Sequence, residues 1–228
     1  MFHATAFQTW HHRTDTAERA PVFPDGCRDV LIVREKGGAE KIILTELDLR
    51  PRVAELAAGT EITGFRLRPG AVVGQGVLAE LRRDCGRAEE VLGNELASGK
   101  AAGKAAGKAA DEIILALVAP GASVESVAAE LGVSRRTLQR QVKALGLPAP
   151  DYWRLLARVR RAAGLLTSGL PLGEIAFLCG FSDQAHMTRE FRRWFGRTPA
   201  ELKVLPDLLV LLCQPALGNW TGEQISTR

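Results

Sequence analysis

The sequence has few cysteines and no segment that suits a membrane. Its 228 residues include four cysteines, which lie far apart and form no CxxC pair. This usage indicates a reduced, intracellular protein without a disulfide framework or a zinc site. The longest apolar run, residues 208–213, is too short to cross a bilayer, and residues 1–10 lack the basic start and apolar core of a signal peptide. We therefore expect a cytoplasmic protein with no membrane partner.

The sequence also lacks the motifs of catalysis and of cofactor binding. It contains no Walker loop, no paired-carboxylate setting and no ordered Ser/His/Asp set. The one histidine pair, His11 and His12, lies in a segment expected to be a strand, where neighbours point to opposite faces and do not share a metal ion. These absences predict a protein that is not an enzyme and has neither a cofactor nor a metal.

Positive charge is concentrated in one region of the chain. The net charge is only +4, but residues 134–203 hold 13 Lys or Arg against 5 Asp or Glu. A basic excess confined to one region indicates a polyanionic partner. The alternative is an ordinary charged face exposed to water.

The pattern of the chain changes at a low-complexity segment. Residues 29–34, 41–47 and 62–67 are β-rich runs, and Gly37-Gly38 indicates a hairpin between the first two. With residues 2–10 they suggest a small barrel or sandwich. Residues 98–110 repeat Gly, Lys and Ala, which favours a flexible linker. The expected domains are a regulatory domain (1–97, β-rich with short helices at its end), the linker (98–110), a helical domain (111–203) and a tail (204–228).

The helical domain contains two segments of the pattern helix, tight turn, helix. In the first, Ser123 and Ser134 are suited to cap the two helices, and Gly132 suits the turn. In the second, Gly180 suits the turn and Ser182 is the expected cap of the following helix. That helix has an apolar stripe on one side and Gln, Thr and Arg on the other. Such a helix is typical of recognition in a DNA major groove.

The second of these segments strongly resembles the signature of the AraC/XylS family of bacterial transcription regulators. The matching residues are Ile175-Ala176, Gly180-Phe181, Arg189, Phe191, Gly196 and Thr198-Pro199. Residues 151–167 resemble the linker helix that joins the two helix-turn-helix units of that family. The resemblance covers about residues 111–203. The overall fold class expected is α+β: a small β-rich amino-terminal barrel or sandwich, then an all-α domain with two helix-turn-helix units joined by a linker helix.

This resemblance implies a function and a set of DNA contacts. It implies a sequence-specific regulator, an activator in our interpretation, that binds double-stranded DNA and works with RNA polymerase. A small effector and a homodimer are further expected partners. Side chains near the start of each recognition helix read bases in the family, and the remaining arginines are expected to hold the DNA backbone. The residues are Arg136, Gln139, Arg140, Gln184 and Arg189 for bases, and Arg192, Arg193 and Arg197 for phosphates. About two of the five base candidates are expected to touch only phosphate.

A separate arginine pair precedes the linker. Arg83 and Arg87 have the RxxxR spacing and resemble the pair with which PilZ-type domains bind cyclic di-GMP. Guanidinium groups bind phosphates and stack on guanine, so the chemistry suits this ligand. The companion [DN]xSxxG element of PilZ domains is absent. Cyclic di-GMP is therefore one candidate effector, beside an unspecified small molecule and no ligand at all.

Two other classes of function stay open at this point. One is a ligand-independent regulator or a purely architectural DNA binder, which would show little sequence preference. The other is an alkyl-transfer repair enzyme fused to a DNA-binding domain, which needs a reactive cysteine. Cys27, next to Arg28 and Asp29, is the candidate for that role.

Overall fold

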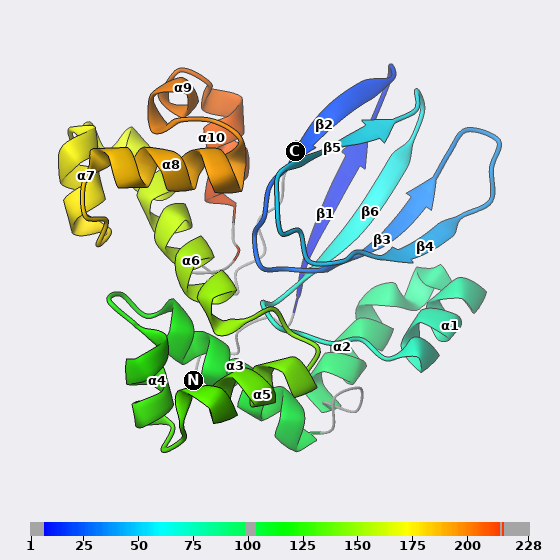
Figure 1. Ribbon diagram of the computed structural model, residues 1–228. Helices are drawn as coiled ribbons and strands as arrows, with labels where there is room; N and C mark the ends of the chain where they lie inside the picture. The colour runs from blue at the N-terminus through cyan, green and yellow to red at the C-terminus, as the bar shows by residue number, and fades with distance from the viewer. Residues whose placement is uncertain (1–6, 99–103, 215, 217–228) are drawn as a thin grey trace.

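The structure, a computed structural model, describes residues 7–98, 104–214 and 216. Figure 1 shows two parts next to each other: a β-sheet with two short helices below it, and a helical part arranged along a long central helix, α6. All strands of the described chain lie in the first part and most of its helices in the second. The fold class is therefore α+β, as the sequence predicted.

Four antiparallel strands form the main sheet in the order β1-β6-β3-β4. Val30 lies opposite Leu44 and Val33 opposite Lys41, which confirms the hairpin that Gly37-Gly38 predicted. Gly37 has a positive φ of 76°, a conformation that favours glycine. The bounds of the strands are β1 (Phe7–Arg13), β3 (Asp29–Arg34), β4 (Lys41–Leu44) and β6 (Glu61–Leu67).

Two further strands, β2 (Glu18–Val22) and β5 (Arg52–Leu56), continue the ladder of β1 and β6 beyond a break. Arg13 lies opposite Glu61 before the break, and Glu18 lies opposite Leu56 after it. Four residues separate β1 from β2, and four separate β5 from β6, so the pairing register is the same before and after the break. Thr14 closes the break, because its backbone N–H donates to Thr60 O over 2.9 Å and its hydroxyl donates to the carbonyl of Ala57.

The sequence predicted the main sheet better than its extension. The described residues contain no closed barrel, and β2 and β5 were not predicted. Their sequences, ERAPV and RVAEL, carry charges and a proline instead of a β-branched run. Such segments have weak strand propensity by themselves. They pair because the ladder of β1 and β6 has already fixed their register.

Two helices cover one side of the sheet. Helix α1 (Gln75–Arg83), a 3-10 turn at Cys85–Arg87 and helix α2 (Ala88–Ser98) follow the last strand. Leu78, Leu81 and Leu92 of this segment form one buried cluster with Phe65 and Leu67 of β6. The short helices expected at the end of the amino-terminal part are thus present, and they cover its hydrophobic core.

The helical part begins earlier than the sequence predicted. Helix α3 runs over Lys104–Val118, so residues 104–110 of the expected linker are helical. Alanine and lysine are strong helix formers, and the turns that follow carry the apolar residues Ile113, Ile114 and Leu117, which are buried. This combination outweighs the cost of about 1 kcal/mol for each glycine. Residues 99–103 of the expected linker lie outside the described residues, and the domain boundaries stay predictions.

The remaining helices follow in short steps. None of the helices in the described ranges is long and apolar enough to cross a membrane. The expected linker helix is present, one residue earlier at its start and ending in a 3-10 turn at Leu165–Thr167. The helices are α4 (Val124–Glu130), α5 (Arg135–Ala144), α6 (Pro150–Gly164), α7 (Leu172–Leu178), α8 (Gln184–Phe195), α9 (Pro199–Lys203) and α10 (Pro206–Cys213).

Candidate nucleic-acid interface

Helices α4 and α5 form the first helix-turn-helix unit. Ser123 caps α4 in a capping box with Ser126, whose backbone N–H donates to the Ser123 hydroxyl over 2.9 Å. Ser134 caps α5 by accepting from the backbone N–H of Thr137 over 3.1 Å. Gly132 has a φ of 67°, which lets the chain turn sharply between the two helices. The local signals of the sequence are therefore all realised here.

The outer face of α5 is polar and accessible. Leu138 and Val142 are buried, and this places the residues between them on the opposite side. The side chains of Arg136, Gln139 and Arg140 are exposed, and none of them makes a hydrogen bond or an ion pair with another described residue. Their polar groups are thus available to a partner.

Helices α7 and α8 form the second unit, which has the same plan with one correction. Gly180 makes the turn with a φ of 72°. The cap of α8 is Asp183 and not Ser182 as predicted, because the helix begins one residue later, at Gln184. The Asp183 carboxylate accepts from the backbone N–H of His186 over 2.6 Å. That hydrogen bond lowers the pKa of Asp183 below its ordinary value, with a smaller contribution from Arg189.

The outer face of α8 is also polar and exposed. The side chains of Gln184, Arg189 and Arg192 are exposed and make no hydrogen bond or ion pair within the described chain. Arg193 is exposed as well, but its guanidinium lies 5.3 Å from the ring centre of Trp194. Trp194 is buried, so the tryptophan belongs to the core. The side chains predicted to touch DNA therefore lie on the free face of each unit.

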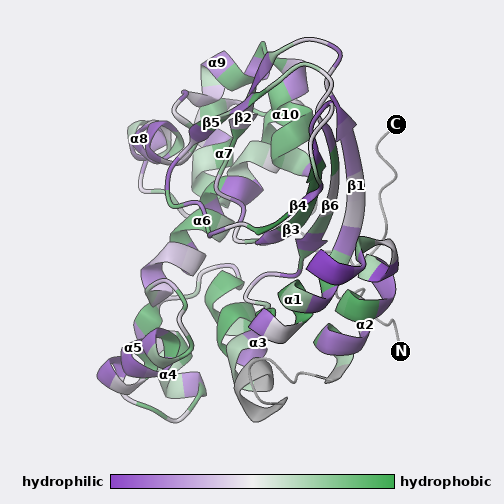
Figure 2. Cartoon of the chain, turned by 90° about the vertical axis from the view of Figure 1, so that its right-hand side faces the viewer, coloured by the Kyte–Doolittle hydropathy of each residue, from purple (hydrophilic) through white to green (hydrophobic). Residues whose placement is uncertain are grey.

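The long helix α6 holds the two units at its opposite ends. Figure 1 shows α8 at one end of α6 and α5 at the other, and in the rotated view of Figure 2 both lie on the same side of the molecule. Trp153, Leu156 and Val159 of α6 are completely buried between the units. A helix of 15 residues is about 22 Å long at 1.5 Å per residue. The arrangement presents two polar helix faces in one direction, separated by a rigid spacer.

The amino-terminal part packs directly against the second unit, which the sequence did not indicate. The ring of Phe23, from the segment between β2 and β3, meets Phe195 of α8 edge to face at 5.9 Å. The hydroxyl of Tyr152 in α6 donates to the backbone carbonyl of Asp48 over 3.1 Å. Leu47 also packs against the core of the helical part. These contacts depend on tertiary placement, and nothing in the local pattern reveals them.

A buried arginine joins three distant segments at this junction. Arg160 of α6 is only 7% exposed, and its guanidinium donates to the carbonyls of Leu212 (2.8 Å), Gln214 (3.1 Å) and Pro24 (3.4 Å). Burial lowers the pKa of Arg160, since the charged form is desolvated. Sequence analysis placed this arginine within the linker-helix pattern, but only the structure identifies it as a link between the halves.

A second buried ionic group lies beside Arg160. The Nε atom of Arg66 lies 3.5 Å from Asp25 and 3.6 Å from Asp29, and Trp10 donates to Asp29 over 2.9 Å. Burial raises the pKa of Asp29, and Arg66 opposes that shift. Burial also raises the pKa of Cys27 well above its ordinary value. The segment from residue 24 to residue 29 is therefore a charged, closely packed connection.

The arginine pair predicted to hold a ligand lies elsewhere, on the surface of α1 and the turn after it. Arg87 forms an ion pair with Glu90 over 2.7 Å, and the Nε atom of Arg83 lies 3.4 Å from the carbonyl of Ala79 in its own helix. Both arginines are exposed. The structure does not test whether they bind a ligand, so that assignment stays a prediction.

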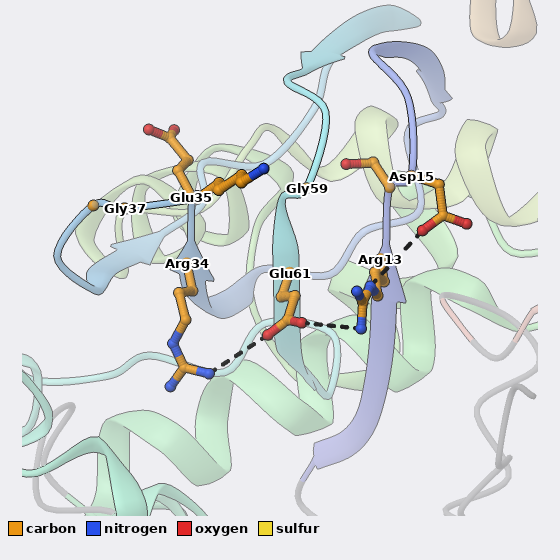
Figure 3. A pocket seen from close by; sticks show the side chains of 10 residues that line it. Arg13, Asp15, Arg34, Glu35, Gly37, Gly59 and Glu61 are labelled. Atoms are coloured by element: carbon orange, nitrogen blue, oxygen red, sulfur yellow. Dashed lines mark hydrogen bonds and ion pairs between the residues drawn. The ribbon is translucent and has the colours of Figure 1, made fainter.

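The amino-terminal part has an open pocket that this pair does not line. Figure 3 shows it at the turn between β3 and β4 and at the break between β1 and β2, with a volume of about 410 Å³. Glu61 bridges Arg13 (3.4 Å) and Arg34 (3.5 Å) on its wall. Cations and carboxylates alternate around it and largely neutralise each other. The lining residues are Arg13, Thr14, Asp15, Arg34, Glu35, Lys36, Gly37, Gly38, Gly59 and Glu61.

Comparisons with known proteins find helix-turn-helix regulators that are similar to part of the chain. A family model described as "Helix-turn-helix domain" matches residues 127–203. The HTH-type transcriptional regulator VirS of Mycobacterium tuberculosis H37Rv is 41% identical over 81 residues, which are 36% of this chain and 24% of the relative. The ornithine utilization regulator of Pseudomonas aeruginosa PAO1 is 38% identical over 97 residues, which are 40% of this chain and 28% of the relative. The match thus spans about a quarter of the length of these relatives.

Solved structures are also similar to part of the chain. The transcriptional regulator of Chromobacterium violaceum, described among AraC-type DNA-binding domain-containing proteins, is 31% identical and covers 46% of this chain and 93% of its own, with a TM-score of 0.38. The helix-turn-helix match contains α5, α6, α7 and α8, the helices that build the two exposed faces. Residues 127–203 match a helix-turn-helix domain of the AraC type, which confirms the resemblance seen in the sequence.

Proposed function

We propose that this protein is a sequence-specific regulator of transcription that binds double-stranded DNA through α5 and α8. The observation that carries the proposal is the pair of polar helix faces on one side of α6. Two recognition helices held in this way suit successive major grooves, which lie roughly 34 Å apart along one face of the duplex. Arginine recognises guanine and glutamine recognises adenine through paired hydrogen bonds. The proposed base contacts are Arg136, Gln139, Arg140, Gln184 and Arg189.

Arg192 and Arg193 have a different role in the proposal. Arg193 is partly held by Trp194 and lies 3.9 Å from Glu190, so it is less free to adjust to a base edge. Contacts to phosphate fix the register of a protein on DNA without reading its sequence. We assign Arg192 and Arg193 to that function.

The experiment is a selection of binding sites from a random duplex pool with the full chain, followed by footprinting on the selected site. The full chain is used because Phe23, Leu47 and Leu212, all outside residues 111–203, pack into the helical core. We expect protection over about two helical turns and an affinity that falls steeply with salt, since bound arginines release counterions. Protection of one groove only, or equal affinity for random DNA, would contradict the proposal that the protein binds specifically in two grooves.

Within this proposal, the chain activates transcription from the cytoplasm, in contact with RNA polymerase and as a homodimer. Transcription in vitro from a promoter that carries the selected site tests the first part. A rise in transcript on addition of the protein supports activation, and a fall indicates repression. Sedimentation with and without the duplex measures the number of chains per site.

An effector is a separate part of the proposal, with cyclic di-GMP at Arg83 and Arg87 as the named candidate. The support for it is chemical, because both guanidinium groups are on the surface. To bind the ligand, Arg87 would have to leave its ion pair with Glu90. Titration calorimetry with cyclic di-GMP decides the matter. If no heat is released at tens of micromolar ligand, this candidate is ruled out, because a signalling site should be occupied at such concentrations. A Kd of 1 μM corresponds to a binding free energy of about −8 kcal/mol. A regulator without any ligand is then the simpler assignment.

The alternative of an alkyl-transfer enzyme is disfavoured by the environment of Cys27. Its thiol is 4% exposed, and burial, followed by the charge of Asp25, raises its pKa well above the ordinary value. A nucleophilic cysteine needs the opposite, a stabilised thiolate that a substrate can approach. The relatives named above also carry the names of transcription regulators.

A further inference from the structure

The connection between β4 and β5, residues 45–51, is fixed against the second helix-turn-helix unit. Its first residue, Thr45, donates its backbone N–H to Asp29 O over 2.9 Å. In its middle, Asp48 accepts the hydrogen bond of Tyr152. At its end, Pro51 lies against Gly196, where an added Cβ would stand 3.5 Å from the proline Cγ. The connection therefore has a defined position next to the carboxyl end of α8.

Positive charge is concentrated at the same end of α8. Arg192, Arg193 and Arg197 are exposed there. The nearby carboxylate of Glu201 is already engaged, since it accepts from the backbone N–H of Thr198 over 2.6 Å. Glu190 lies no closer than 3.9 Å to Arg193. This end of the helix is therefore a basic surface that its own carboxylates neutralise only in part.

Arg50 adds a further cation to this surface from the other half of the molecule. It is exposed and lies between the two anchored residues Asp48 and Pro51. It makes no hydrogen bond or ion pair with another residue of the described chain. Arg52, two positions later, differs, because its Nε atom donates to Asp48 over 2.6 Å. Arg50 is thus a free charge on a fixed backbone.

The connection lies on the side of the molecule where the two recognition helices lie. In Figure 1 it passes close to the right-hand end of α8, and in Figure 2 β2 and β5 lie next to α8. A duplex that follows α6 and places α5 and α8 in its grooves passes next to this connection. The strand that borders the groove of α8 then brings its phosphates to the surface formed by Arg192, Arg197 and Arg50.

We propose that Arg50 binds the phosphodiester backbone of DNA and gives the amino-terminal half a contact of its own with the duplex. The inference rests on the proposed function and names a residue outside the helix-turn-helix domain. A phosphate and not a base is the partner, since the connection lies beside α8 and not within the groove that α8 occupies. Positively charged side chains placed in this way contribute affinity that does not depend on base sequence.

The test compares three variants of the full chain on two duplexes. The variants are Arg50→Ala, Arg50→Lys and the control Arg82→Ala, an exposed arginine of α1 that lies far from α8. The duplexes are a 40-base-pair random pool and one site selected from it, and affinity is measured by fluorescence anisotropy between about 50 and 200 mM salt. Circular dichroism confirms that each variant is folded, which the exposure of both arginines favours.

We expect Arg50→Ala to weaken binding to both duplexes by the same factor, about fivefold at 0.1 M salt. The slope of log affinity against log salt should fall by about 0.9, the value for one phosphate contact. Arg50→Lys should retain most of the affinity because it keeps the charge. Arg82→Ala should match the wild type.

Three results would overturn the inference. The first is an Arg50→Ala variant that binds like the wild type. The second is an equal loss in Arg50→Ala and Arg82→Ala, which would reflect only total charge. The third is a loss confined to the selected site, which would indicate contact with a base. If the wild-type protein instead bound neither duplex, the proposed function would be refuted, and the proposed contact of Arg50 would be refuted as well.

Discussion

The two helix-turn-helix units share a plan but differ in what supports them. Each has a polar cap, a glycine turn and an exposed face of Arg and Gln. The recognition helix of the first is anchored by the aliphatic side chains of Leu138 and Val142. That of the second is anchored by large side chains, including Phe191 and Phe195, and Phe195 also meets Phe23 of the amino-terminal half. Within the described residues, the amino-terminal half contacts α8 directly through Phe23, whereas its ion pair between Arg68 and Asp111 reaches α3 and not α5.

This difference indicates an unequal division of tasks between the units. The position of α5 depends on neighbours that are close in the sequence. The position of α8 depends also on Tyr152, Asp48 and Pro51, which belong to or contact the amino-terminal half. Any change in how the halves pack therefore acts first on the second unit. The predictions below test this asymmetry.

Truncation of a core side chain should have the largest effect. Phe195→Ala and Leu138→Ala should each lower the free energy of unfolding, by about 3–5 and 2–5 kcal/mol, because each leaves a cavity. Urea denaturation followed by far-UV circular dichroism measures this. Only Phe195→Ala should also speed amide hydrogen exchange in residues 23–28. Equal exchange in that segment in both variants would show that the two units are supported alike.

Removal of a predicted base contact should be the next largest effect. Arg136→Ala and Arg189→Ala should each weaken the selected DNA site by about 1–3 kcal/mol and relax base preference at different positions. Binding to a library of single-base variants of the site measures both. Arg193→Ala should weaken all sequences alike. If Arg136 and Arg189 affected the same base pairs, the units would not lie in separate grooves.

Substitution of the turn glycines should lower the stability of both units equally, since each glycine makes the same turn with a positive φ. Gly132→Ala and Gly180→Ala should each cost about 1–2 kcal/mol, because a side chain is strained at φ values of 67° and 72°. Thermal unfolding measures the loss. The control is Gly164→Ala in α6, where φ is −60° and nothing lies within 4 Å of an added Cβ. That change should be stabilising by about 0.5–1 kcal/mol.

The smallest expected effect is a difference in acid sensitivity between Asp183, the cap of α8, and Ser134, the cap of α5. The pKa of Asp183 is lowered in the folded protein, so the stability that its carboxylate contributes is present above the ordinary pKa of about 3.9. It is lost as pH falls through the lowered value. Ser134, the corresponding cap of α5, does not titrate. Acid should therefore loosen α8 before α5, as read from the fluorescence of Trp194 between pH 5 and pH 2.

The control for this titration is Asp183→Asn, which keeps a capping oxygen without a charge. Glu201 also has a lowered pKa and titrates in the same direction, so the difference between the two proteins isolates Asp183. Identical pH profiles would show that the cap of α8 does not contribute to acid sensitivity.

The parts of the fold that the sequence predicted are those fixed by local rules. Gly132, Gly180 and Ser134 act within one or two turns of helix, and their roles follow from spacing and residue type. The hairpin of β3 and β4 is local in the same sense. Strands β2 and β5 were missed because their pairing depends on partners at least 30 residues away. The start of α3 was missed because propensity outweighed the glycines of the repeat.

The candidate site divides in the same way. The exposed positions of Arg136, Arg189 and their neighbours follow from helical periodicity. The role of Arg160 does not, because a buried guanidinium that donates to three carbonyls looks in the sequence like any other arginine of a basic helix. The position of Pro51 against Gly196, next to Arg50 in the chain, is equally a product of tertiary packing.

The three hydrogen bonds of Arg160 also determine when the molecule can be complete. They join residues separated by 136, 52 and 54 positions in the chain. During synthesis the amino-terminal half and most of α6 leave the ribosome before Leu212 and Gln214 exist, and contacts of such wide separation form late in folding. Until then the guanidinium of Arg160 lacks two of its three carbonyl partners. We therefore expect the docking of the two halves around α6 to be among the last events of folding.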